Sequence, residues 1–247
     1  MTSVLVAGGA TGIGRAAVRA FRDRGDAVLL ADRNLSGAEA VVAEDRPGPA
    51  RAFACDLATV DGPAAAVAAA AEHGQGLDVV FANAGVLLAA PLEEWTVADW
   101  DRTMAVNLRA PFLLAQAALP LLRASGCPRL IFTASTGALR GHAGMPAYHA
   151  SKAGLVNLVR ALADELGPLG ITVNAICPGW IDTAFNDAFW HHQADPDTAR
   201  TALEASIPLR RQGTPEDVVG TVLHLASEAS AYVTGQAIVV DGGYTAV

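Results

Sequence analysis

Short apolar runs alternate with longer helical stretches along the whole chain, and this alternation constrains the fold more than any other feature. The apolar runs fall at residues 4–7, 27–31, 51–55, 78–82, 129–134, 172–176 and 237–240. The stretches between them predict helices at 13–24, from 36 onward, and at 63–73, 97–122, 147–166 and 215–225. Strands that alternate with helices form a parallel sheet with helices on both faces. We therefore predict an α/β fold with one doubly wound parallel sheet and a single domain, residues 1–247, because no repeat or linker divides the chain.

Three segments carry the pattern of a capping residue followed three positions later by an acid. They are Ser36 with Glu39, Thr96 with Asp99, and Thr214 with Asp217. In such a capping box the two side chains satisfy free backbone N–H groups at a helix start. We expect a helix to begin at each of these places.

A glycine-rich turn, Gly8-Gly9-Ala10-Thr11-Gly12-Ile13-Gly14, follows the first apolar run at once. A strand, a glycine turn and a helix N-terminus together bind anions, because backbone N–H groups and the helix dipole face a phosphate. Asp32 ends the next strand, where a dinucleotide-binding fold places a carboxylate for the adenosine ribose. The glycine spacing differs from Gly-x-Gly-x-x-Gly, so a plain strand-to-helix turn remains the alternative.

Tyr148 and Lys152 lie four residues apart at the start of a predicted helix, so their side chains share one face. Lys152 is the only lysine, since every other basic side chain is an arginine. A phenol with a pKa of about 10 is a poor base at neutral pH, and a nearby cation favours its ionised form. The pair is therefore a candidate for proton transfer, although a solvated helix face would show the same spacing.

The composition excludes several classes of protein. The chain is 52% hydrophobic and 17% charged, as expected for a globular protein, and its net charge of −8 argues against nucleic acid or anionic membrane as a partner. We see no signal peptide, because a strand begins by Val4 without a basic segment before it. The three scattered cysteines, Cys55, Cys127 and Cys177, indicate reduced thiols and a cytoplasmic location.

The stretch from 178 to 200 is predicted to be irregular and to border the substrate. It contains Trp180, Phe185, Phe189 and Trp190, although only 6% of the chain is aromatic. Long loops in compact domains usually bind ligands, so these rings predict an apolar pocket, or else they pack the loop onto the body. We expect no metal site, because His191-His192 has no third ligand at a suitable spacing.

Polar residues or glycines follow the predicted strands at their carboxyl ends, where ligands bind to such sheets. With these residues at its strand ends, the chain resembles the short, single-domain branch of the short-chain dehydrogenase/reductase family over essentially its whole length. The match is carried by Gly8 to Gly14, Asp56, Asn83-Ala84-Gly85, Asn107, Ser135, Tyr148, Lys152, Pro178-Gly179, Thr183 and Asp241-Gly242. Ala7 and Ala82 depart from the residues usual at their positions. The resemblance implies a Rossmann-type sheet.

The resemblance also implies a catalytic tetrad of Asn107, Ser135, Tyr148 and Lys152. Tyr148 would exchange a proton with a secondary alcohol or ketone, and Ser135 would hydrogen-bond the same oxygen. Lys152 would lower the pKa of Tyr148 and hold the nicotinamide ribose. Asn107, a polar residue in mid-helix that helix propensity alone would leave solvated, would bend its helix around a water that links Lys152 to solvent.

The resemblance assigns the cofactor contacts as well. They are Gly8, Thr11, Gly12, Ile13, Gly14, Asp32, Arg33, Asp56, Leu57, Asn83, Ala84, Gly85, Tyr148, Lys152, Pro178, Gly179, Ile181 and Thr183. Asp32 favours NAD because a carboxylate would repel the 2′-phosphate of NADP, whereas Arg33 could bind that phosphate. Relatives pair their two long helices between subunits, so we expect a homotetramer.

These observations predict an NAD(H)-dependent oxidoreductase that interconverts a secondary alcohol and a ketone. The substrate is expected to be cyclic, aromatic or of medium chain length. The resemblance implies that Leu87, Leu88 and residues 139–145 form the second wall of the pocket. An NADPH-dependent 3-oxoacyl reductase and a polyol or sugar dehydrogenase remain alternatives. A non-catalytic dinucleotide sensor is disfavoured because Tyr148 and Lys152 are both present, and a nucleotide-sugar epimerase would need a larger C-terminal domain.

Overall fold

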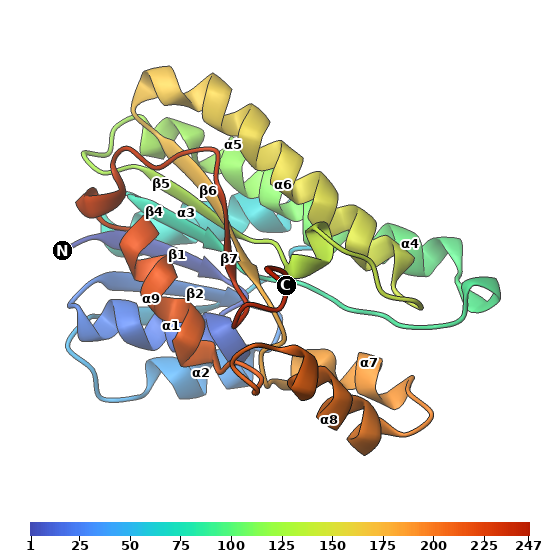
Figure 1. Cartoon of the computed structure of the whole chain (residues 1–247). Coiled ribbons are helices and arrows are strands. Elements are labelled where there is room, and N and C mark those ends of the chain that lie inside the picture. The colour runs from blue at the N-terminus through green and yellow to red at the C-terminus, as the bar shows by residue number, and fades with distance from the viewer.

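A computed structural model describes residues 1–247. Seven parallel strands form one sheet in the order β3-β2-β1-β4-β5-β6-β7 (Figure 1). The strands are β1 (Ser3–Ala7), β2 (Ala27–Asp32), β3 (Ala50–Ala54), β4 (Val79–Ala82), β5 (Arg129–Thr133), β6 (Thr172–Pro178) and β7 (Ala237–Val240). The predicted doubly wound parallel sheet is confirmed, and each strand lies within two residues of its predicted bounds.

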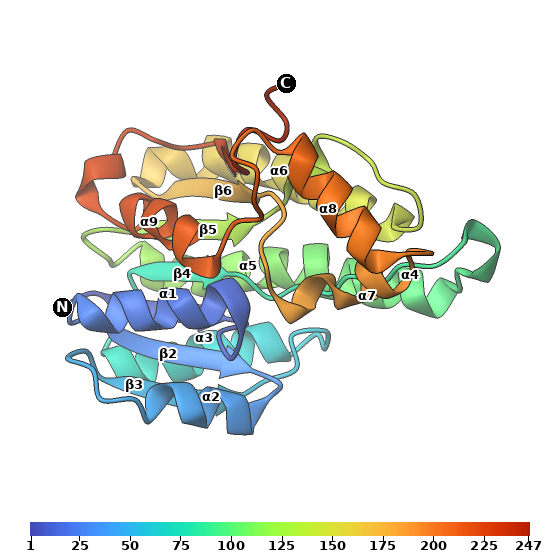
Figure 2. The same cartoon turned by 60° about the horizontal axis from the view of Figure 1, so that its bottom comes forward.

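Helices cover both faces of the sheet, as both views show (Figures 1 and 2). One face carries α1 (Gly12–Asp23), α2 (Leu35–Val42) and α9 (Pro215–Leu225), and the other carries α3 (Gly62–Gly74), α5 (Ala110–Leu122) and α6 (Pro146–Leu166). Side chains alternate along each strand, so that Leu5 and Ala7 join the core on one face while Val4 and Val6 join the core on the other. Apolar runs without polar alternation are thus explained by burial on both sides.

The strand order reverses at the centre of the sheet. The chain runs outward from β1 to β2 and β3, then returns to the other side of β1 as β4. Ala7, the last residue of β1, pairs with Ala31 on β2 and with Ala82 on β4. The turns that follow β1 and β4 leave the sheet in different directions, and such a switch point is where open α/β sheets bind ligands.

One continuous helix runs from 97 to 122, as predicted, but it is not regular. It consists of α4 (Val97–Met104), a π-helical turn (Ala105–Arg109) and α5. This helix is long and apolar enough to cross a membrane. However, 44% of its most apolar 18-residue segment is buried inside the protein. The π-helical turn contains Asn107, and such turns are frequent at functional sites.

One of the three predicted capping boxes is wrong. Helix α2 begins at Leu35, and Asn34 caps it by accepting a 3.1 Å hydrogen bond from the Gly37 amide. Asn is as good a cap as Ser and comes first in the chain, which leaves Ser36 inside the helix. The other two helices begin where predicted, after Thr96 and Thr214, and the Thr214 box has both reciprocal hydrogen bonds.

The prediction of an irregular stretch from 178 to 200 is also wrong. This stretch contains α7 (Asp187–His191) and the start of α8 (Pro196–Ser206), which lie beside the edge where the strands end (Figure 2). The Asp195 carboxylate caps α8 by accepting a 3.2 Å hydrogen bond from the Thr198 amide, and Pro196 occupies the first helical position. Asp-Pro was therefore a helix start signal that the prediction overlooked.

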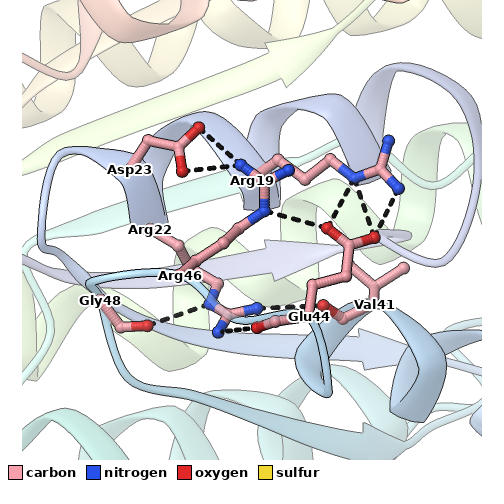
Figure 3. A network of polar contacts seen from close by, with 7 residues as sticks. All are labelled: Arg19, Arg22, Asp23, Val41, Glu44, Arg46 and Gly48. Atoms are coloured by element: carbon pink, nitrogen blue, oxygen red, sulfur yellow. Dashed lines mark hydrogen bonds and ion pairs between the residues drawn. The ribbon is translucent and has the colours of Figure 1, made fainter.

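A polar network ties α1 to the connection between α2 and β3 (Figure 3). The buried Arg22 guanidinium donates to three main-chain carbonyls, those of Val41, Glu44 and Gly48. Beside it, the Glu44 carboxylate accepts from Arg19 and Arg46, and Arg46 also contacts Asp23. The network fixes the helix whose N-terminus faces the glycine turn.

Candidate active site

The chain turns at the end of β1 through Gly8 and Gly12, which have φ angles of 85° and 51°. A Cβ atom on Gly8 would lie 2.6 Å from the Ala84 Cα, so only glycine fits there. The Asn83 amide donates a 2.8 Å hydrogen bond to the Gly8 carbonyl and ties the turn to the end of β4. Because α1 starts here with no side-chain cap and no acid in its first turn, its first N–H groups are available to an anion.

The Asp32 carboxylate lies beside this turn. One oxygen accepts a 3.0 Å hydrogen bond from the Ala10 amide, and the other accepts a 2.9 Å hydrogen bond from the Asn34 amide. Each oxygen keeps a free lone-pair position, because a carboxylate can accept about four hydrogen bonds. The group is therefore held in place and can still accept from two ligand hydroxyls.

A cleft of about 690 Å³ follows the carboxyl ends of the strands. Its walls contain nearly all of the predicted site residues: Gly8, Thr11, Gly12, Ile13, Asp32, Arg33, Asp56, Leu57, Asn83, Ala84, Gly85, Ser135, Tyr148, Lys152, Pro178, Gly179, Ile181 and Thr183. Gly14 and Asn107 lie behind the wall. A Cβ atom on Gly14 would meet the Gly8 carbonyl oxygen at 1.9 Å, so this glycine lets α1 pack closely on the turn.

Tyr148 and Lys152 are both buried on α6, one helical turn apart. The Lys152 Nζ atom lies 5.8 Å from the centre of the Tyr148 ring and donates a 2.7 Å hydrogen bond to the Thr133 carbonyl on β5. Thr133 also donates its hydroxyl proton to Asn83, at 3.0 Å. The end of β5 therefore fixes the ammonium and connects it to the glycine turn.

Burial dominates the electrostatics of this pair. It raises the pKa of Tyr148 to about 12, although the hydrogen bond with Ser135 acts in the opposite direction. It lowers the pKa of Lys152 to about 8. A dry site penalises the charged form of each group, so Lys152 by itself does not bring the pKa of Tyr148 into the neutral range in the protein alone.

Ser135 stands between the end of β5 and a short 3-10 turn, Thr136–Ala138. Its Oγ atom accepts a 2.9 Å hydrogen bond from the Gly137 amide. Since that bond uses an acceptor position, the hydroxyl proton remains available to an oxygen in the cleft. Ser135 can therefore act as a donor beside Tyr148.

The Asn107 side chain joins the π-helical turn to the loop after β4. Its Oδ1 atom accepts from the Val86 amide at 2.8 Å, and its Nδ2 atom donates to the Val86 carbonyl at 2.9 Å. Nδ2 also lies 3.2 Å from the hydroxyl of Ser151, which in turn donates to the Tyr148 carbonyl at 2.7 Å. A residue that helix propensity alone would leave solvated is thus buried, and its amide supports the helix that carries Tyr148.

Comparisons with known proteins identify the family. A family model described as enoyl-(acyl carrier protein) reductase matches residues 8–245. D-threitol dehydrogenase of Mycolicibacterium smegmatis is 38% identical to this chain over 245 residues, which cover 98% of this chain and 92% of that protein. The chain belongs to the short-chain dehydrogenase/reductase family.

Two further relatives extend the comparison. Cis-4-hydroxycyclohexanecarboxylate dehydrogenase of Sinomonas cyclohexanicum is 36% identical over 246 residues, which cover 98% of this chain and 96% of that protein. The crystal structure of a putative NAD(P)-dependent gluconate 5-dehydrogenase from Beutenbergia cavernae, with NADP bound at low occupancy, has a TM-score of 0.90 and 35% identity. The match covers 100% of this chain and 97% of the chain in that crystal structure. This protein is therefore an oxidoreductase of the short-chain family.

The residues present fit the nicotinamide dinucleotide that short-chain dehydrogenase/reductases use. Gly8 and Gly12 carry no Cβ atom in the turn before α1, and the first N–H groups of α1 suit a pyrophosphate. Asp32 offers acceptors to a ribose at one end of the cleft, and Lys152 offers a cation at the other.

The aromatic residues after β6 fall into two groups. Trp180, Phe189 and Trp190 pack against one another, with ring centres 4.7 to 5.3 Å apart, in a small core of their own. Phe185 instead faces the cleft, with its ring centre 6.1 Å from that of Tyr148. The predicted pocket of four rings is therefore only partly right, since Trp180 and Phe185 line the cleft and the other two do not.

The opposite wall differs from the prediction in the same way. Leu87, His142 and Met145 line the cleft, whereas Leu88 and the exposed Leu139 do not. These positions have no periodic pattern that could have separated them. This wall of the cleft therefore contains fewer apolar side chains than the sequence predicted, and it includes the polar His142.

The prediction missed one histidine altogether. His149 follows Tyr148 directly, and neighbouring residues on a helix point about 100° apart, so sequence spacing gives no reason to place both side chains in one cleft. In the structure His149 also lines the cleft, since residues 137–142 fold back over the start of α6 and extend the wall past that face. The position of His149 in the cleft depends on how residues 137–142 fold, and no spacing in the sequence indicates it.

Proposed function

We propose that the protein is an NAD(H)-dependent oxidoreductase that interconverts a secondary alcohol and a ketone, with residues 1–247 acting as one domain. The observation that carries the proposal is that Tyr148, Ser135 and Lys152 line the same cleft as the glycine turn and Asp32. A proton-transfer group and a dinucleotide site in one cleft are what alcohol oxidation requires.

The residues divide the work in the following way. Tyr148 takes the proton from the substrate hydroxyl in oxidation and returns it in reduction. Ser135 donates a hydrogen bond to the same oxygen and orients it, because the bond from the Gly137 amide fixes its Oγ atom and leaves the hydroxyl proton free. Lys152, fixed by the Thr133 carbonyl, stabilises the Tyr148 phenolate once a cofactor adds its own positive charge. Asn107 holds the π-helical turn behind them.

The cofactor supplies the hydride acceptor in oxidation and the hydride in reduction. Gly8, Gly12 and the N-terminus of α1 would hold its pyrophosphate. We propose NAD over NADP because the Asp32 carboxylate accepts ribose hydroxyls but repels a 2′-phosphate at contact distance. The relative with bound NADP and the exposed Arg33 in this chain are the arguments for testing both cofactors.

A compact cyclic or aromatic secondary alcohol suits the substrate end of the cleft. Trp180, Phe185, Met145 and Leu87 supply apolar surface there, and binding scales with the apolar area removed from water. The relative that is a hydroxycyclohexanecarboxylate dehydrogenase supports a ring-shaped substrate.

A polyol is the second candidate, and one observation favours it. His142 brings an imidazole to the cleft wall, and neither of its ring nitrogens has a hydrogen-bond partner in the protein. The similarity to a D-threitol dehydrogenase points the same way.

We further propose a cytoplasmic homotetramer. The helix from 97 to 122 leaves Val97, Trp100 and Phe112 exposed, and a groove runs between it and α6. An apolar face of this kind is commonly covered by another subunit.

A substrate screen with both cofactors tests the proposed function. Initial rates on ketones and secondary alcohols are followed by the absorbance of reduced nicotinamide, and the panel includes a 3-oxoacyl thioester. We expect turnover of secondary alcohols with NAD, and a higher kcat/KM for a phenyl-substituted alcohol than for a four-carbon polyol. A polyol that wins by about tenfold, a difference of 1.4 kcal/mol, would replace the first substrate class by the second. Failure of every secondary alcohol and ketone would reject the function.

A further inference from the structure

Both ring nitrogens of His149 are engaged by the segment that forms the substrate wall. Nδ1 lies 2.8 Å from the Gly137 carbonyl oxygen, and Nε2 accepts a 2.9 Å hydrogen bond from the His142 amide. A carbonyl can only accept and an amide N–H can only donate, so the ring is neutral with its proton on Nδ1. The hydrogen bonds therefore select one tautomer.

The first of these bonds connects His149 to Ser135. The Gly137 peptide whose carbonyl accepts from His149 donates its own N–H to the Ser135 Oγ atom. The ring packs tightly against this peptide, because a Cβ atom on Gly137 would lie 2.9 Å from the His149 Nδ1. A shift of the imidazole would therefore move the group that orients the Ser135 hydroxyl.

The second bond fixes the place of His142. Its ring stands edge-on to Trp180, with centres 5.6 Å apart, and nearly parallel to Tyr244 at 6.4 Å. Burial is the main cause that lowers the pKa of His142, and the charge of Arg140 acts in the same direction, so the His142 imidazole is neutral. A neutral imidazole offers one donor and one acceptor, and both are free here.

We propose that His149, as the neutral tautomer, is a positioning residue that holds Ser135 through Gly137 and presents the His142 imidazole to a second oxygen of the substrate. This inference rests on the proposed function and narrows its substrate class. The preferred substrate is a secondary alcohol with a further hydroxyl or carbonyl group on the side away from Tyr148. An apolar ring between those two oxygens would contact Trp180 and Phe185, which reconciles the two substrate candidates.

Four substitutions separate the effects of the two His149 hydrogen bonds from the effect of the His142 imidazole. His149→Phe keeps a ring and removes both hydrogen bonds. His149→Asn keeps an amide near the Nδ1 position, and His149→Gln keeps an acceptor near the Nε2 position, so each preserves one bond. His142→Phe removes the free nitrogens but leaves the backbone N–H that binds His149. His224→Phe, on the exposed end of α9, is the control.

The assays use cyclohexanol and cyclohexane-1,4-diol, which differ by one hydroxyl. We expect His149→Phe to lower kcat/KM for both about tenfold or more, His149→Asn and His149→Gln to lower it less, and the Kd of NAD to change less than twofold. His142→Phe should lower kcat/KM about fivefold for the diol alone, mainly through KM. The inference is overturned if His149→Phe stays within twofold of wild type, or if the losses follow thermal stability and cofactor affinity.

A second readout does not depend on activity. Nitrogen-15 NMR of the histidine rings, with the His149 signal assigned by its loss in His149→Phe, should show a single neutral form with the proton on Nδ1. A proton on Nε2, or an exchanging mixture, overturns the inference even if the enzyme is active. A wild type that turns over no secondary alcohol or ketone in the substrate screen, while this tautomer is observed, rejects the proposed function instead.

Discussion

The Lys152 ammonium lies 5.8 Å from the centre of the Tyr148 ring, buried inside the protein and held by the end of β5. The cation is therefore close enough to act on the phenol but does not hydrogen-bond it. Because burial raises the pKa of Tyr148 to about 12, the phenol in the protein alone loses its proton less readily than free tyrosine does. We therefore propose that the positive charge of the cofactor helps Lys152 to stabilise the Tyr148 phenolate.

Lys152→Met tests the charge of this pair. In the proposed mechanism the Tyr148 phenolate is the base in alcohol oxidation, so removing a nearby cation makes the phenolate harder to form and raises the pKa of Tyr148. The kcat profile for oxidation should move to higher pH by about 1 to 2 units, and the rate at pH 7 should fall. Lys152→Arg keeps the charge and should shift the profile less. An unchanged profile in Lys152→Met would show that Lys152 acts only by binding the cofactor.

Asp32→Asn tests the cofactor preference. The substitution removes the negative charge but keeps an oxygen that can accept from the Ala10 amide. We expect the ratio of kcat/KM for NAD to that for NADP to fall about tenfold or more, mainly because NADP binds better. Wild-type protein that prefers NADP would show that Arg33 outweighs Asp32.

The pH dependence of stability should report the Glu44 network. Hydrogen bonding from Arg19, with a further contribution from Arg46, lowers the pKa of Glu44 from 4.5 to about 2. A carboxylate with a depressed pKa in the folded state stabilises that state above its unfolded pKa, and the contribution is lost as the pH falls from about 4.5 to about 2. Urea unfolding of wild type and Glu44→Gln should therefore differ at pH 6 and converge toward pH 2.5. A difference that does not change with pH would contradict this assignment.

Light scattering tests the assembly. We expect four times the 25.3 kDa mass of the chain. Phe112→Glu, on the exposed face of α5, should dissociate the assembly, whereas Leu209→Glu, exposed outside that helix, should not. A wild-type monomer at micromolar concentration would reject the tetramer.

The sequence predicted the strands and long helices well because their signals are local. Burial on both faces makes each strand a short apolar run. The start of α9 is likewise marked by adjacent residues, because Thr214 caps the helix and Pro215 is its first residue. The cofactor end of the cleft was predictable for a related reason, since Gly8 and Asp32 stand directly at strand ends.

The substrate end was less predictable because long-range packing decides it. Phe185 and Phe189 are four residues apart, yet one faces the cleft and the other joins a separate core with Trp190. The pKa of Tyr148 also depends on how dry the folded site is, which no spacing records. His149 was missed because its partners, Gly137 and His142, reach it only through the fold of their segment.

Tyr148→Phe tests the central claim most directly, because it removes one hydroxyl with little change of shape. The proposed role of that hydroxyl is proton transfer, so NAD should bind with nearly the wild-type Kd while kcat falls by about 100-fold or more. Both quantities are measured on the same preparation, by fluorescence titration and by initial rates on the best alcohol from the screen. A variant that retains more than about a tenth of the wild-type kcat would contradict the assignment of Tyr148 as the group that exchanges the proton.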